Sequence, residues 1–73
     1  MKIVKSRHYK LYHEGDFPWD EVVEVILTTK KQRIGKSLFR FVRRSKRREV
    51  YILARYDSEK DELKVINAKR RRR

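Results

Sequence analysis

Two histidines are the side chains of this 73-residue chain best suited to moving a proton near neutral pH. His8 and His13 stand five residues apart, so on one helix they would point about 140° from each other and would not share a metal ion. The segment His13-Glu14-Gly15 also lacks the second histidine, four residues on, that a zinc-protease motif needs. We therefore predict His8 and His13 as candidate catalytic residues that use no metal and no other cofactor.

Three side chains in apolar stretches could act on a phosphate together with the histidines. Arg40 and Arg55 interrupt apolar runs, so each guanidinium must point to an exposed face, where it can hold a phosphate through two hydrogen bonds. Tyr56, like Tyr51, could stack on a nucleic-acid base. We predict Arg40, Arg55 and Tyr56 as further catalytic candidates. The alternative is that all of them are ordinary strand residues that pack or face solvent.

The net charge of +12 indicates an anionic partner, and the commonest partner of such a basic chain is nucleic acid. Residues 30–48 contain ten basic residues and no acidic one, and residues 69–73 are all basic. The predicted nucleic-acid-binding residues are all basic and lie mainly in these two stretches: Arg40, Arg43, Arg44, Lys46, Arg47, Arg48, Arg55, Lys69 and Arg70. The alternative is a solvated surface followed by a tail that aids solubility.

The composition excludes several classes of protein. No apolar run approaches the ~18 residues of a membrane span, and the absence of cysteine excludes disulfides and thiolate metal sites. The eight aromatic residues and a periodic apolar pattern argue against full disorder. We expect a cytoplasmic protein without membrane association, with one domain over residues 1–69 and a disordered basic tail over residues 70–73.

The spacing of the apolar residues predicts two helices after a short strand at residues 2–5. Ser6 can cap a first helix in which His8, Leu11 and Tyr12 share one face, and Gly15 can end it. A second helix begins after Pro18, which suits a first helical turn. Its apolar stripe, which we predict to be core, consists of Trp19, Val22, Val23, Ile26 and Leu27.

After Gly35 the apolar period changes to two, which indicates strands at residues 38–42, 50–56 and 63–68. The predicted fold class is therefore α+β, in the order β-α-α-β-β-β, with two helices packed on one face of an antiparallel sheet. By alternation, Phe39 and Phe41 point one way and Arg40 points the other.

The chain resembles the small RelE-like toxins, and within them the BrnT-like group and its short relatives. Three segments carry the likeness: a short helix with a histidine and a glycine turn at residues 8–15, the helix start Trp19-Asp20-Glu21-Val22, and a closing strand followed by bases at residues 64–70. The Trp-Asp pair that opens BrnT-like proteins and their closing helix are absent here.

This resemblance implies a metal-independent endoribonuclease that acts on RNA, alone or on the ribosome, and is neutralised by an acidic antitoxin. Such an enzyme promotes attack of the ribose 2′-hydroxyl on the adjacent phosphate, which needs a proton acceptor, a proton donor and stabilising cations. Two alternatives stay open. One is a non-catalytic nucleic-acid-binding module, and the other is a protein-interaction domain whose basic surface docks an acidic partner.

Overall fold

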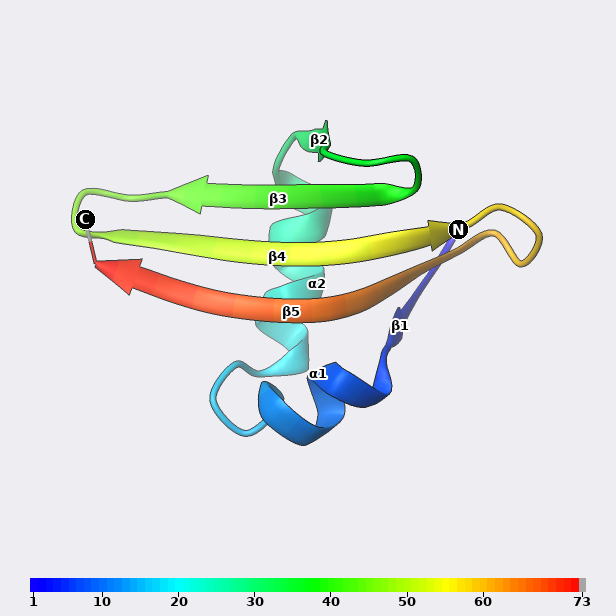
Figure 1. Ribbon diagram of the computed structural model, residues 1–73. Coiled ribbons are helices and arrows are strands. Elements are labelled where there is room, and N and C mark those ends of the chain that lie inside the picture. Colours follow the sequence, from blue (N-terminus) through cyan, green and yellow to red (C-terminus); the bar gives the residue numbers. More distant parts are fainter. Residues whose placement is uncertain (73) are drawn as a thin grey trace.

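A five-stranded sheet and two helices form the computed structural model, which describes residues 1–72 (Figure 1). The elements in chain order are β1 (Lys2–Lys5), α1 (Arg7–Tyr12), α2 (Trp19–Thr28), β2 (Lys31–Arg33), β3 (Leu38–Arg44), β4 (Arg48–Asp57) and β5 (Glu62–Arg72). The strand order across the sheet is β1-β5-β4-β3-β2. The predicted α+β class and the strand-helix-helix-strand order are confirmed.

Two features of the sheet differ from the prediction. β1 runs parallel to β5, whereas the other neighbouring strands are antiparallel. β2 was not predicted, because its three residues, Lys-Gln-Arg, contain no apolar side chain that could show a period of two. β2 pairs with β3 at the edge of the sheet, where such a polar strand loses little by facing solvent.

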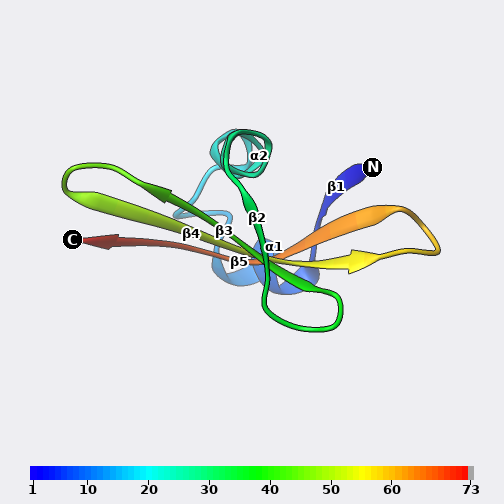
Figure 2. The ribbon, with the colours of Figure 1, turned by 90° about the horizontal axis from the view of Figure 1, so that it is seen from above.

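The helices leave one face of the sheet open. α2 lies across the other face, against β3 and β4, and α1 lies beside β5 (Figures 1 and 2). The buried apolar side chains come from both helices, the turn between them and the strands: Tyr9, Phe17, Val22, Val25, Ile26, Phe41, Val50, Ile52, Ala54, Leu63, Val65 and Ala68. The predicted alternation in β3 fits this core, since Phe41 is buried, Phe39 packs against it and Arg40 points to the other side. We call the side of the sheet away from α2 the open face.

The buried faces of both helices differ in part from the predicted ones. In α2, the predicted Val22 and Ile26 are buried and Trp19 packs against the core, but Val25 is buried as well and Leu27 is 70% exposed. In α1, Tyr9 is fully buried, whereas Leu11 and Tyr12 are exposed. The predicted helix cap is present, because the Ser6 hydroxyl accepts a hydrogen bond from the Tyr9 backbone N–H at 3.0 Å. The two helices are only six and ten residues long and carry apolar side chains on several faces. Tertiary packing therefore determines which face is buried.

The basic tail that we expected to be disordered continues β5 through Arg72, and Arg73 lies outside the described residues. Arg70, Arg71 and Arg72 pair in register with the first residues of β4. The Arg70 guanidinium donates to the Asp16 backbone oxygen at 2.6 Å, forms an ion pair with Glu21 and lies 4.2 Å from the centre of the Phe17 ring. These contacts explain why the strand persists despite its charge. Within residues 1–72, no helix has the length and apolar character needed to cross a membrane.

Candidate nucleic-acid interface

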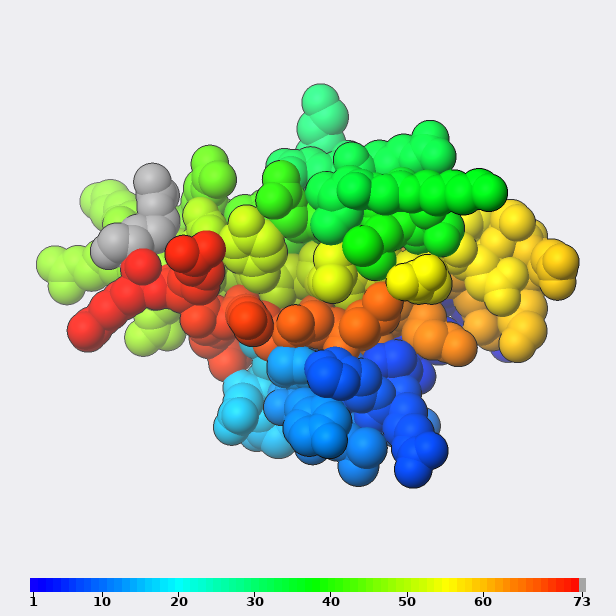
Figure 3. Space-filling view, viewed as in Figure 1, coloured from blue at the N-terminus to red at the C-terminus, as the bar shows by residue number. Residues whose placement is uncertain are grey.

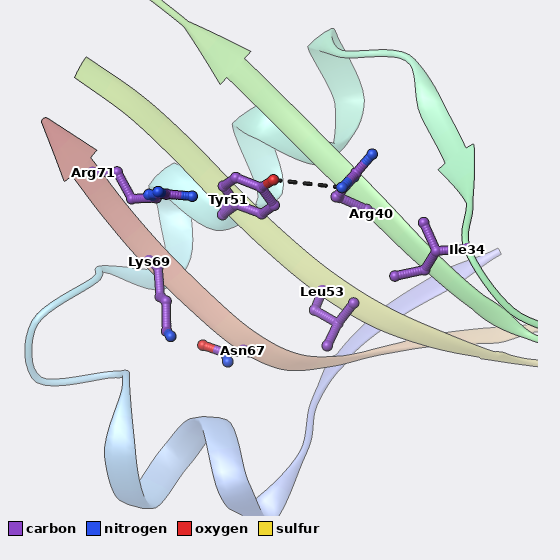
Figure 4. Close-up of a pocket in the computed structure, with 7 residues that line it drawn as sticks. All are labelled: Ile34, Arg40, Tyr51, Leu53, Asn67, Lys69 and Arg71. Atoms are coloured by element: carbon purple, nitrogen blue, oxygen red, sulfur yellow. Dashed lines mark hydrogen bonds between the residues drawn. The ribbon is translucent and has the colours of Figure 1, made fainter. Parts of the chain in front are cut away.

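A shallow hollow of about 460 Å³ lies on the open face (Figure 4). Figure 3 shows the surface of this face, which β3, β4 and β5 form together. The hollow is lined by Ile34, Arg40, Tyr51, Leu53, Asn67, Lys69 and Arg71. We call it the open-face hollow. β3, β4 and β5 bring these side chains together, because Arg40 pairs with Leu53, Leu53 with Asn67, and Tyr51 with Lys69. The lining therefore combines an aromatic ring and aliphatic side chains with three cations and no carboxylate.

The Arg40 guanidinium is held beside the Tyr51 ring. Its Nε and one terminal nitrogen donate to Gln32 Oε1 at 3.0 and 2.7 Å, and its other terminal nitrogen lies 3.4 Å from the Tyr51 hydroxyl oxygen. The guanidinium carbon is 5.7 Å from the centre of the Tyr51 ring, within the range of a cation–π contact. The short strand β2 thus positions Arg40 through Gln32.

The loop between β2 and β3 projects away from α2 (Figure 2) and contributes Ile34 to the lining of the open-face hollow. Arg33 holds this loop by donating to the backbone oxygens of Gly35 and Lys36 at 3.1 and 3.0 Å. The Ile34 backbone N–H donates to the Leu38 oxygen at 2.9 Å. These bonds fix Ile34 at the edge of the hollow.

Lys69 and Arg71 are the cations of the open-face hollow whose side chains make no hydrogen bond or ion pair with another residue in the 1–72 range. Three other predicted binding residues, Arg43, Arg44 and Arg70, already form ion pairs with carboxylates of this chain. Arg43 donates to Glu24 at 3.2 Å and to Thr28 at 3.0 Å, and Arg44 pairs with Glu49 at 2.8 Å. Two of the three, Arg43 and Arg70, reach the helix side and bond to α2 or the turn before it. We therefore reassign Arg43 and Arg70 to holding α2 on the sheet.

The remaining predicted binding residues lie outside the open-face hollow. Lys46, Arg47 and Arg48 are exposed at the β3–β4 turn, which is closed by a 2.9 Å hydrogen bond from Ser45 N to Arg48 O. Arg55 is exposed and lines a separate hollow that also contains Asp57 and Glu59. Arg40 and Arg55 therefore face the same side of the sheet without converging on one site.

Tyr56 lies on the helix side, away from Arg40. Its ring packs against the core, and its hydroxyl donates to Asp61 Oδ1 at 2.6 Å. This hydrogen bond raises the pKa of Tyr56 and lowers the pKa of Asp61. The structure therefore does not place Tyr56 with the other candidate catalytic residues.

The two histidines lie together, with their ring centres 5.0 Å apart, so the prediction that they point apart is wrong. His13 is the C-cap of α1, with φ −126° and ψ −29°, and the helical period no longer applies there. His8 is exposed, and His13 is half-buried with its Nε2 buried and without a hydrogen-bond partner. Across residues 1–72, no cluster of three or more histidines and carboxylates could hold a metal ion.

The environment of His13 predicts a pH-dependent stability. Burial lowers the pKa of His13, the charges of His8 and Lys69 lower it further, and Asp16 and the Ala68 backbone oppose the shift. The unfolded chain then binds a proton more readily than the folded one, so the free energy of unfolding should fall as the pH drops below 6.5, the ordinary pKa. Urea unfolding between about pH 7.5 and 5.5 should show this fall, and His13→Gln should flatten it. An equal fall in the variant would contradict the role of His13.

No protein-family model, no curated protein and no solved structure matches this chain. The resemblance to RelE-like toxins therefore stays a prediction.

Sequence reasoning missed Arg71, Asn67, Leu53 and Ile34 as lining residues. Arg71 lies in the tail that the sequence predicts to be disordered, and the sequence predicts Leu53 only as part of the strand at residues 50–56. The signal that could have found them is the period of two, because Leu53 follows Tyr51 by two residues and Asn67 and Arg71 flank Lys69 at the same spacing.

Proposed function

We propose that this protein binds single-stranded nucleic acid, in the first place RNA, across the open face of its sheet. The observation that carries the proposal is the half-buried Tyr51 ring, set by Arg40 in a hollow with two unpaired cations, Lys69 and Arg71. Sheet faces of this kind bind RNA by stacking unpaired bases on aromatic rings, while cations contact the phosphates.

A single strand fits this surface better than a duplex. The ring of Tyr51 can stack only on a base that has left its own helix. The exposed basic residues Lys46 and Arg47 at the β3–β4 turn add positive charge outside the open-face hollow, where a flexible strand can also reach them.

Binding without cleavage is the form that the geometry supports best. Metal-independent cleavage needs a proton donor, a proton acceptor and cations around one phosphate. The candidates lie in separate places: Arg40 in the open-face hollow, Arg55 in another hollow, Tyr56 on the helix side, and His8 and His13 at α1. Cleavage stays a prediction of the resemblance, and intact RNA after incubation with protein and chelator over a pH series would overturn it.

The salt dependence of binding tests the proposal. If about six phosphates are contacted, the logarithm of the affinity for single-stranded RNA should fall with log salt with a slope of about −4. The double variant Lys69→Gln/Arg71→Gln should make the slope shallower by about 1.4. The matched control Lys30→Gln/Lys60→Gln removes two exposed charges away from the open-face hollow and should leave the slope nearly unchanged. A slope near zero, or equal effects of the two double variants, would overturn the proposal.

A second hollow favours a second function, the docking of an acidic protein partner. This helix-face hollow, of about 490 Å³, lies between the end of α2 and β3, and its apolar lining includes Ile26, Leu27, Phe39, Phe41 and Leu63. Lys31, with its Nζ 4.8 Å from the centre of the Phe39 ring, adds positive charge to this lining. An acidic segment with exposed apolar side chains complements both the lining and the net charge of +12.

A peptide can test this second function. A helical peptide with leucines on one face and glutamates on the other should bind the protein, and Leu27→Asp should weaken binding about tenfold or more. The control Leu11→Asp changes an equally exposed leucine on α1 and should have little effect. Equal losses in the two variants would contradict the assignment, as would displacement of the peptide by RNA, since the two hollows lie on opposite faces.

A further inference from the structure

The charged side chains of the open-face hollow offer hydrogen-bond donors and no acceptor. Arg40, Lys69 and Arg71 have only N–H groups. The Tyr51 hydroxyl oxygen lies 3.4 Å from a donating nitrogen of Arg40, so its own hydrogen is left for a ligand. A ligand that enters the hollow therefore meets donors on several sides.

The nearby acceptors are already used or turned away. Gln32 Oε1 receives two hydrogen bonds from Arg40, and the Glu49 carboxylate is paired with Arg44. Asn67 lines the hollow, but its Oδ1 is buried, so its NH₂ group is the part of the amide left for a ligand. A hydrogen-bond donor of a ligand bound in the open-face hollow would therefore find no free acceptor among these side chains.

We infer that the open-face hollow selects keto bases, guanine and uracil, over the amino bases adenine and cytosine. This inference rests on the proposed binding of single-stranded nucleic acid and names the bases that the same site prefers. Guanine presents two adjacent acceptors, O6 and N7, that match the paired N–H groups of an arginine such as Arg71, and uracil presents the O4 acceptor. Adenine and cytosine present an amino group instead, which would lie unpaired against Lys69 and Arg71.

Matched strands test the inference because they exchange a keto group for an amino group on the base. Oligouridine and oligocytidine of equal length differ at the 4-position, where uracil has an oxygen and cytosine an amino group, and at N3, which carries a proton only in uracil. A second pair carries one inosine or one adenosine at the centre of an oligocytidine strand, which changes only the 6-substituent and the proton at N1. Fluorescence anisotropy at fixed salt should give about fivefold or greater preference for uridine and for inosine.

The protein variants identify where the preference arises. Lys69→Met/Arg71→Met should bring the uridine-to-cytidine ratio close to one, whereas Lys30→Gln/Lys60→Gln should keep it. Equal affinity for the two members of each pair, or stronger binding of the amino bases, would overturn the inference and leave the proposed function standing. Failure of every strand to bind would overturn the proposed function itself.

Discussion

Replacing Tyr51 with alanine is expected to weaken binding of single-stranded RNA about 5- to 160-fold. A base stacked on an aromatic side chain contributes about 1–3 kcal/mol, and Tyr51 is the aromatic residue that lines the open-face hollow. Arg40 beside the ring makes the loss larger, because without the ring the guanidinium loses its neighbour on β4. The affinity is measured by anisotropy titration at one fixed salt concentration.

Two other tyrosine variants make this result specific. Tyr51→Phe keeps the stacking ring and removes only the hydroxyl near Arg40, so it should weaken binding much less than Tyr51→Ala does. Tyr12→Ala removes an exposed ring on α1, outside the open-face hollow, and should have a much smaller effect. If Tyr12→Ala weakened binding as much as Tyr51→Ala, stacking at Tyr51 would be the wrong explanation.

Replacing Tyr9 with alanine should lower the free energy of unfolding by about 3–5 kcal/mol. The side chain is fully buried, its ring lies 5.5 Å from the Trp19 ring, and its hydroxyl donates to the Phe17 backbone oxygen at 2.5 Å. The substitution therefore removes a large ring and leaves a carbonyl without its donor. Small domains have a stability of about 5–15 kcal/mol, so this loss should remove a large part of the free energy of unfolding and lower the denaturation midpoint.

The contribution of the hydroxyl can be separated from that of the ring by chemical denaturation. Tyr9→Phe keeps the packing but leaves the Phe17 oxygen unpaired, and it should cost about 1–3 kcal/mol. Tyr12→Ala changes an exposed tyrosine of the same helix and should shift stability by about 0.5 kcal/mol or less. A Tyr9→Ala protein that unfolds at the wild-type denaturant concentration would show that Tyr9 does not hold α1 on the sheet.

Local patterns predicted most elements of the fold and part of the buried face of α2, since Val22 and Ile26 are buried. The period of two in β3 and β4 depends only on backbone geometry, so the placement of Phe41 and Arg40 on opposite sides could be predicted. The burial of Tyr9 and Val25 could not, because Tyr9 is selected by its bond to Phe17 and Val25 by the position of α2 over β3 and β4. The spacing of apolar residues along a helix gives no information about the Tyr9–Phe17 hydrogen bond or about where α2 packs on the sheet.

The residues of the candidate site could be predicted where their position follows from strand alternation. They could not be predicted where an arginine forms an ion pair with a residue far away in the sequence. Arg40, Tyr51 and Lys69 are all in or beside the open-face hollow. Arg43 and Arg70 looked equivalent to them in the sequence, but each binds a carboxylate of α2 that lies 19 or 49 residues away. A count of charges cannot distinguish a cation that is free to bind a phosphate from one that already pairs with a carboxylate of the same chain.

The parallel pairing of β1 with β5 also constrains the order of folding. Lys2 lies opposite Glu62 and Lys5 opposite Val65, so the first strand finds its place only against the last. The hairpins β3–β4 and β4–β5 join neighbouring segments and can form earlier, because they close short loops. During synthesis, β1 and α1 can therefore pack in place only after β5 has left the ribosome. Until then no sheet covers the ring of Tyr9.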